Sequence, residues 1–90
     1  MRLDKFLKVS RLIKRRTVAN EACDGGRITV NGKIAKASYD VRIGDELGIR
    51  LGSREIRVTV LSVAETIHKD DAAGMYREVV QSITEGNTEI

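Results

Sequence analysis

Residues 26–33 read Gly-Arg-Ile-Thr-Val-Asn-Gly-Lys, and this stretch indicates the architecture more strongly than any other part of the chain. Ile28 and Val30 alternate with polar residues, as expected of a half-buried strand. Asn31-Gly32 follows, and this dipeptide predicts a tight hairpin turn because both residues tolerate the positive φ of a type I′ turn. The stretch therefore predicts two antiparallel strands joined at this turn.

The register of the hairpin follows from the length of its turn. A two-residue turn places Val30 opposite Lys33 and, three pairs further on, Arg27 opposite Lys36. Like charges that face each other across a hairpin are slightly destabilising. A phosphate bound between them would reverse the sign of that interaction, so the hairpin is a first indication of a polyanionic ligand.

Upstream of the hairpin, apolar residues recur at helical spacing. Intervals of three and four relate two sets of side chains, which are Leu3, Phe6, Leu7 and Ile13 in the first and Val18, Ala22 and Cys23 in the second. Gly25-Gly26 predicts the end of the second helix, because glycine accepts the left-handed conformation there. We therefore expect two short helices before the hairpin, with Phe6 and Cys23 in the core.

Downstream of the hairpin, apolar and polar residues alternate again in two stretches, near 47–51 and 56–60, on either side of Gly52-Ser53. With the hairpin, they predict a small curved sheet of about four strands, antiparallel or mixed. The expected fold class is α+β, with the two N-terminal helices packed on this sheet.

The C-terminal quarter of the chain carries another apolar pattern. Asp70 and Asp71 suit the positive end of a helix dipole. A helical stripe follows them, made of Ala72, Met75, Tyr76, Val79 and Ile83. We therefore expect a main domain over residues 1–65, and a C-terminal helix and tail over 66–90 that pack on it or extend it.

The composition limits the classes of function. The chain has 90 residues, which form one small domain with little room for a deep pocket. A single cysteine excludes a disulfide framework and suits a reducing cytosol, and no apolar run approaches the ~20 residues of a membrane span. Aromatic residues are 3% of the chain, so we expect no aromatic stacking platform.

The charged residues are segregated along the chain. Residues 1–50 carry twelve basic and six acidic side chains, whereas residues 51–90 carry four basic and seven acidic ones. Seven of the basic residues fall within the first sixteen positions, with one acid. A positive field concentrated in this way attracts polyanions, although a solvated helix face has a similar pattern.

Reactive groups are sparse. His68 is the only histidine and Cys23 the only cysteine, and neither lies in a local catalytic signature. The glycine pairs lack the lysine and the spacing of a phosphate-binding loop. We therefore expect no enzyme activity, no metal site and no cofactor.

Several short motifs occur in a familiar order. They are Arg2-Leu3-Asp4-Lys5-x-Leu7, Arg11, Lys14-Arg15-Arg16, Ala19, Gly26-Arg27-Ile28-x-Val30-Asn31-Gly32, Lys36-Ala37-Ser38, Val41 and Gly44-Asp45-Glu46-Leu47. Over residues 1–50 this series resembles the S4 RNA-binding domain. More narrowly, the chain resembles the RqcP (YabO) family of single-domain S4 proteins in ribosome-associated quality control, and the related small heat-shock S4 protein. Ala72-Ala73-x-Met75-Tyr76 adds to the likeness to the RqcP family.

The resemblance implies an S4-type αL fold whose helices and hairpin form an RNA-binding surface. It implies a cytoplasmic factor that binds the rRNA of obstructed large (50S) ribosomal subunits. There the factor would hold the P-site tRNA while an RqcH-like tailing factor adds C-terminal alanines. We expect a monomer in solution.

The expected RNA-binding residues come from two sources. The family motif implies Arg2, Asp4, Lys5, Arg11, Lys14 and Arg16. Charge and hairpin geometry add Arg15, Arg27, Lys33 and Lys36. Among them Asp4 is expected to orient a neighbouring arginine, because a carboxylate that faced phosphate directly would be repelled.

Three alternatives stay open at this point. The first is an S4 protein of ribosome assembly that never meets peptidyl-tRNA. The second is an accessory domain of an enzyme, as S4 domains are in pseudouridine synthases and tRNA synthetases. The third is a protein adaptor that binds through the helix around Met75-Tyr76, for which binding would be insensitive to salt.

Overall fold

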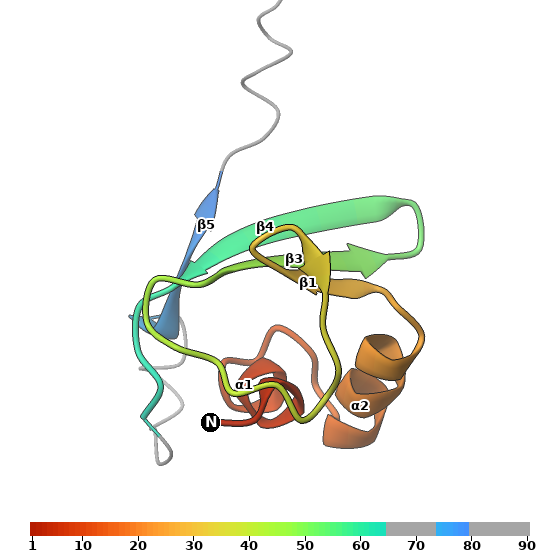
Figure 1. The fold of residues 1–90 in the computed structure, drawn as a ribbon, viewed down its shortest axis with the longest axis horizontal. Helices are drawn as coiled ribbons and strands as arrows, with labels where there is room; N and C mark the ends of the chain where they lie inside the picture. The colour runs from red at the N-terminus through yellow and green to blue at the C-terminus, as the bar shows by residue number, and fades with distance from the viewer. Residues whose placement is uncertain (65–73, 80–90) are drawn as a thin grey trace, which may run out of the picture.

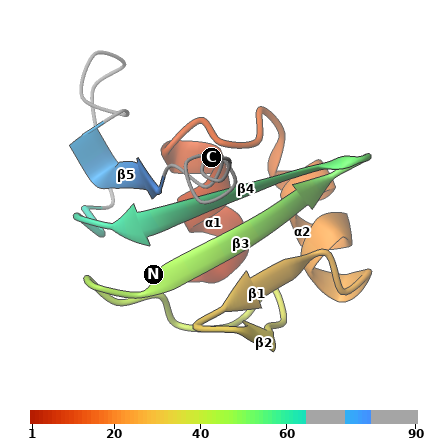
Figure 2. The same cartoon turned by 90° about the horizontal axis from the view of Figure 1, so that it is seen from above.

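Two helices cover one face of a five-stranded antiparallel sheet in the computed structural model, which describes residues 1–64 and 74–79 (Figure 1). The helices are α1 (Leu3–Val9) and α2 (Arg16–Asp24). The strands are β1 (Ile28–Val30), β2 (Lys33–Ile34), β3 (Glu46–Leu51), β4 (Arg54–Val60) and β5 (Tyr76–Val79). Seen from above, the strands lie in the order β2-β1-β3-β4-β5, with the helices beneath them (Figure 2). The predicted α+β class and its two N-terminal helices are confirmed.

The hairpin forms as the sequence predicts. Asn31 and Gly32 have φ values of 52° and 87°, as a type I′ turn requires. The paired residues are Val30 with Lys33 and Thr29 with Ile34. The ladder ends there, so the expected pair of Arg27 and Lys36 lies beyond it. The bound-phosphate argument for that pair loses its geometric basis, because it needs the two side chains directly opposite each other.

Both helices end where the backbone turns left-handed. Arg11 follows α1 with a φ of 67°, and Gly26 follows α2 with a φ of 77°. The predicted apolar stripe of α2 is wrong at Val18, which is 45% exposed, whereas the adjacent Ala19 is fully buried. A small side chain suits that position because α2 packs closely on α1.

The core lies between the helices and the sheet. Its fully buried side chains include Phe6 and Leu7 from α1 and Ile28, Leu47 and Val58 from the strands. Cys23 is 2% exposed, so its predicted place in the core is confirmed together with that of Phe6. Strand β1 contributes buried side chains to the core and also leads into the hairpin turn. Burial of these side chains therefore fixes the position of the hairpin relative to α1.

The predicted C-terminal helix is wrong over Tyr76–Val79, which form β5. This strand pairs antiparallel with β4, from Arg57 opposite Val79 to Val60 opposite Tyr76. The spacing of three between Tyr76 and Val79 fits a helix, but both are good strand formers. Pairing also satisfies backbone groups along the edge of β4 that would otherwise stay open. Residues 65–73 and 80–90, where the rest of that helix was expected, lie outside the described residues.

The sheet accordingly has five strands rather than about four, and all of its pairings are antiparallel. Within residues 1–64 and 74–79, neither helix has the length and apolar character needed to cross a bilayer.

Candidate nucleic-acid interface

A buried carboxylate lies in the first turn of α1. Asp4 is 2% exposed and accepts hydrogen bonds from three side chains. Arg2 donates from Nε (3.1 Å) and Nη2 (3.4 Å), one to each carboxylate oxygen. Arg16 donates from Nη2 to Oδ1 (3.5 Å), and its Nε lies 3.4 Å from Oδ2. Asn20 donates from Nδ2 to Oδ2 at 3.2 Å. We call these four residues the Asp4 cluster.

The Asp4 cluster holds two guanidinium groups side by side at the protein surface. The side chains of Arg2 and Arg16 are 50% and 48% exposed, although each contacts the same buried acid. A guanidinium presents five N–H donors in a fixed plane. Each guanidinium therefore has edges that do not face Asp4, and the contacts with Asp4 orient these edges.

Backbone contacts fix the place of Asp4 itself. The amide of Asp4 donates to the carbonyl of Ala37 at 3.2 Å, and the amide of Leu3 donates to the carbonyl of Tyr39 at 2.8 Å. Arg2 forms a β-bridge with Asp40. The first N–H groups of a helix lack partners within the helix, and here segment 37–40 supplies them.

The helix period brings the remaining partners to Asp4. Arg16 is the first residue of α2 and Asn20 is four residues later, so their side chains share one face of that helix. Because α1 and α2 pack together, this face meets the first turn of α1. Asp4, Arg16 and Asn20 line a shallow pocket of about 370 Å³, together with Thr17 and Glu21.

The electrostatics of Asp4 reflect two opposing effects. Burial raises its pKa, but the hydrogen bonds from Arg2, Asn20 and Arg16 outweigh burial and lower the pKa to about 2. The hydrogen bond to Asp4 and its charge also raise the pKa of Arg2. Asp4 is therefore ionised throughout the neutral range and stabilises both guanidinium charges.

Four other predicted basic residues lie between Arg2 and Arg16 in the sequence. Arg11, Lys14 and Arg15 are exposed in the connection between α1 and α2, and Lys5 is partly buried on α1. With Arg2 and Arg16, they make six basic residues between the residue before α1 and the first residue of α2. We call these six residues the helix surface.

The structure places the other three predicted basic residues elsewhere. Arg27 precedes β1, just after the C-terminal end of α2, about 13 Å of helix away from Arg16 at 1.5 Å per residue. Lys33 lies on β2, and Lys36 follows it in the segment that leads back to α1. The ten predicted residues therefore divide into the Asp4-centred helix surface and a separate group on the hairpin side.

Two residues near these groups were not predicted. Asn20 completes the Asp4 cluster, and its position four residues after Arg16 could have indicated it. Tyr39 donates a hydrogen bond from its hydroxyl to Asp45 at 3.0 Å, and Asp45 also accepts one from Asn31 Nδ2 at 3.1 Å. These two contacts span 6 and 14 positions of the chain, respectively. No local sequence pattern predicts them.

The described residues offer little reactive chemistry beside this surface. Burial is the main cause that raises the pKa of the Cys23 thiol to about 11, so the thiolate, which is the reactive form, is scarce at neutral pH. Across residues 1–64 and 74–79, His, Cys, Asp and Glu side chains form no group of three or more that could hold a metal ion. His68 lies outside the described residues.

Comparison with known proteins shows which family this chain belongs to. The model of the S4 domain family matches residues 1–47, which include α1, α2, the hairpin and every member of the Asp4 cluster. The chain belongs to the S4 domain family. The fold agrees: the structure of Heat Shock Protein 15 from Vibrio cholerae, whose description calls it trimeric, superposes with a TM-score of 0.84 at 34% identity, covering 94% of this chain and 87% of that one.

Several relatives have names that are more specific than that of the S4 domain family. The "RQC P-site tRNA stabilizing factor" of Halalkalibacterium halodurans is 59% identical over 76 residues, 84% of this chain and 86% of its own. The protein of the same name from Bacillus subtilis is also 59% identical, over 84% of this chain and 88% of its own. Heat shock protein 15 of Escherichia coli K12 is 34% identical over 92% of this chain and 63% of its own. The predicted resemblance to RqcP-like S4 proteins is confirmed, and the Halalkalibacterium and Bacillus relatives are named as stabilizing factors.

Proposed function

We propose that this chain is a non-enzymatic RNA-binding factor of ribosome-associated quality control in the cytoplasm. In this proposal it binds rRNA and the P-site tRNA on obstructed large ribosomal subunits. It thereby supports C-terminal alanine tailing by an RqcH-like partner. The name shared by its relatives, RQC P-site tRNA stabilizing factor, supports the tRNA part of the proposal.

The observation that carries the proposal is the Asp4 cluster. A buried acid that aims two half-exposed guanidinium groups outward is typical of a site built for phosphate. An isolated pair of surface arginines would lose side-chain entropy on binding, whereas Arg2 and Arg16 have already been ordered by Asp4. The other four cations of the helix surface add positive charge around these two arginines.

Binding energy alone would explain an effect on tailing. A factor that binds one placement of a tRNA more tightly than others makes that placement more populated, by no more than its differential affinity. In the proposed complex, the helix surface contacts rRNA and tRNA together, so the bound state is the one with tRNA in the P site.

The test is to purify a tagged version of the full chain under native conditions and sequence the associated RNA and nascent chains. Obstructed 50S particles that carry tRNA and alanine-tailed chains are expected. Arg16→Ala should weaken ribosome binding by roughly tenfold to a hundredfold, as expected when one charge-assisted contact is lost. The matched control is Arg54→Ala, which removes an equally exposed cation from the start of β4, away from the helix surface.

The outcomes separate the proposal from its alternative. Recovery only with tRNA-free assembly intermediates, with tailing intact after deletion of the gene, would favour the assembly factor. Arg16 also contacts buried Asp4, so the variant must be compared at a temperature where circular dichroism shows it folded.

The proposed complex contains one copy of this chain. The trimeric description of the Vibrio cholerae relative makes the oligomeric state worth measuring directly. Sedimentation equilibrium of the full chain should give the mass of a monomer, 10.0 kDa.

A further inference from the structure

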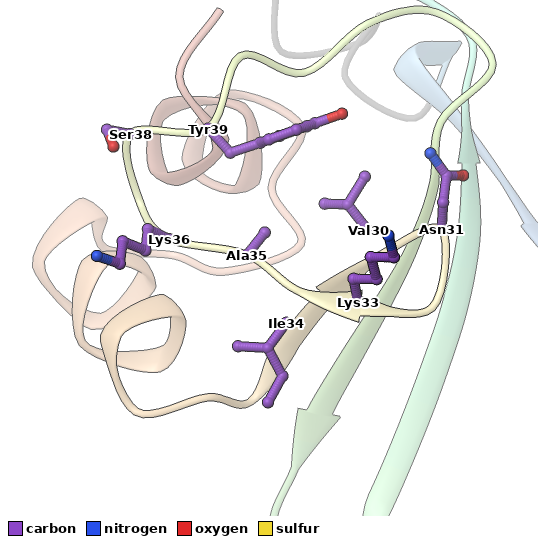
Figure 3. A pocket seen from close by; sticks show the side chains of 8 residues that line it. All are labelled: Val30, Asn31, Lys33, Ile34, Ala35, Lys36, Ser38 and Tyr39. Atoms are coloured by element: carbon purple, nitrogen blue, oxygen red, sulfur yellow. The ribbon is translucent and has the colours of Figure 1, made fainter.

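A second pocket lies on the hairpin side of the molecule, with a volume of about 720 Å³ (Figure 3). The ring of Tyr39 forms one wall, and Val30 and Ala35 contribute apolar side chains. Lys33 extends into the same space from β2, while the side chains of Ile34 and Lys36 point away from it (Figure 3). The pocket therefore combines an aromatic face, an apolar floor and a cation.

The walls of this pocket are fixed by hydrogen bonds. The hydroxyl of Tyr39 donates to Asp45 Oδ2 at 3.0 Å, and that oxygen also accepts the amide of Arg42 at 3.0 Å. Asn31 donates to the other oxygen of Asp45 and accepts the amide of Glu46 at 3.0 Å. One carboxylate thus ties the tyrosine ring to the hairpin turn, so the ring needs no ordering when a ligand arrives.

The pocket is linked to the Asp4 cluster through the backbone of residues 39 and 40. Tyr39 lines the pocket with its ring, while its carbonyl accepts the amide of Leu3. The next residue, Asp40, forms the β-bridge with Arg2. A single short segment therefore separates the pocket from the arginine pair, and one RNA strand would meet both.

We propose that this pocket takes one unpaired RNA nucleotide, its base stacked on Tyr39 and its phosphate at the ammonium of Lys33. The inference rests on the proposed function and adds to it a preference for single-stranded or bulged RNA. A base inside an A-form helix is stacked on its neighbours and cannot reach such a ring, whereas unpaired bases stack readily on aromatic side chains. The low aromatic content led us to expect no stacking platform, but one ring held in a pocket suffices for one base.

The experiment is a nuclear magnetic resonance titration of the full chain with a single-stranded RNA hexamer and with a duplex of equal length. The hexamer should shift the resonances of Tyr39, Ala35 and Val30 saturably. The duplex should shift those of the helix surface and leave these three unchanged. If the hexamer leaves Tyr39 unmoved at millimolar concentration, or the duplex shifts it equally, the proposal is overturned.

Variants give an independent measure. Tyr39→Leu should weaken hexamer binding about tenfold, the scale of one lost stacking contact. Tyr39→Phe keeps the ring but loses the hydrogen bond to Asp45, so it should weaken binding less than Tyr39→Leu does. Lys33→Ala should weaken binding several-fold and Arg54→Ala should leave it unchanged. Equal binding by Tyr39→Leu in its folded state, or by Lys33→Ala, would contradict the assignment.

Failure of this inference is distinguishable from failure of the proposed function. In one case, Arg16→Ala releases the chain from ribosomes but the hexamer does not bind in the pocket. The RNA-binding function then stands and the nucleotide site is wrong. If the hexamer fills the pocket while Arg16→Ala binds ribosomes normally, the proposed role of the helix surface is wrong instead.

Discussion

Asp4 combines a structural role with the binding role that we propose for it. A carboxylate with three donors around it is stable only when ionised, and it holds together two like-charged arginines that would otherwise repel each other. The same contacts that lower its pKa therefore also orient the guanidinium groups that we propose to bind phosphate.

The first prediction at this scale concerns pH. The pKa of Asp4 is lowered to about 2 in the folded chain, against about 4 in the unfolded chain. The stabilisation is therefore fully present above pH ~4 and is lost as the pH falls through ~2. We expect a loss of about 1–2 kcal/mol over this window, because solvent screens the half-exposed arginines. Urea denaturation from pH 6 to pH 2 measures it.

Asp4→Asn is the control for that titration, because Asn cannot ionise. Other carboxylates contribute to acid unfolding in both proteins, so the difference between the two curves isolates Asp4. The variant should be less stable than the unsubstituted chain at neutral pH, and the two should converge near pH 2. Parallel curves down to pH 2 would show that folding does not lower the pKa of Asp4.

Arg11 gives a second prediction at the residue scale. Its φ of 67° is in the left-handed region, which costs a residue with a Cβ about 1–2 kcal/mol and glycine almost nothing. Arg11→Gly should therefore stabilise the fold by roughly 1 kcal/mol in thermal or urea unfolding. If Arg11 contacts RNA as predicted, the same change should weaken ribosome binding.

Arg11→Ala separates the two effects. It removes the same charge but keeps the Cβ, so it should bind as weakly as Arg11→Gly without gaining stability. A stability gain in both variants would mean that charge repulsion, rather than backbone conformation, is the relevant cost at this position.

At the scale of elements, the central strands depend on a close approach between neighbours. Gly48 of β3 lies opposite Thr29 of β1 on one side and Arg57 of β4 on the other. A Cβ at Gly48 would lie 2.5 Å from Oγ1 of Thr29. Glycine normally weakens a strand interior, but here its absence of a side chain lets the hairpin pack beside β3.

The prediction from this contact is that Gly48→Ala destabilises the fold by about 1–3 kcal/mol, the range for forcing extra volume into a packed site. Thr29→Ala removes the clashing oxygen, so the double variant should be more stable than the sum of the two single changes predicts. A double-mutant cycle by urea unfolding measures this coupling. Additive effects would show that the strands accommodate the Cβ by another shift.

At the scale of the whole molecule, charge is distributed unevenly over a small fold. The excess of basic residues in positions 1–50 coincides with the helices, the hairpin and the segment that joins it to α1. On strands β3 and β4, acidic side chains offset the basic charge: Arg57 lies 4.0 Å from Glu46 and 3.9 Å from Glu55. Long-range attraction of RNA is therefore expected from the N-terminal half.

The prediction at this scale is a steep dependence of RNA binding on salt. If about five phosphates are neutralised, a plot of log affinity against log salt concentration should have a slope of roughly −3 to −5. Arg2→Ala and Arg16→Ala should each reduce the magnitude of the slope by about one. A titration of structured RNA by fluorescence anisotropy at several salt concentrations measures it. A flat response would contradict binding through phosphate contacts.

Features that depend on neighbours in the chain were determined by the sequence alone. The Asn31-Gly32 dipeptide placed the hairpin turn and the two strand pairs next to it, and the spacing of apolar residues placed both helices, although Val18 is exposed. The order of short motifs indicated the S4 family, and the clustered cations indicated a polyanionic ligand. Each of these follows from interactions within one turn, one strand pair or one helix face, which a linear pattern records.

Features that depend on packing were decided only by the tertiary structure. Burial between two helices brought Asp4 to Arg16 and Asn20, and the open edge of β4 made Tyr76–Val79 a strand rather than a helix. Tyr39 reached Asp45 in the same way. The physical reason is that a hydrogen bond between distant residues, or an unpaired sheet edge, exists only once the elements have packed. Local spacing carries no record of either.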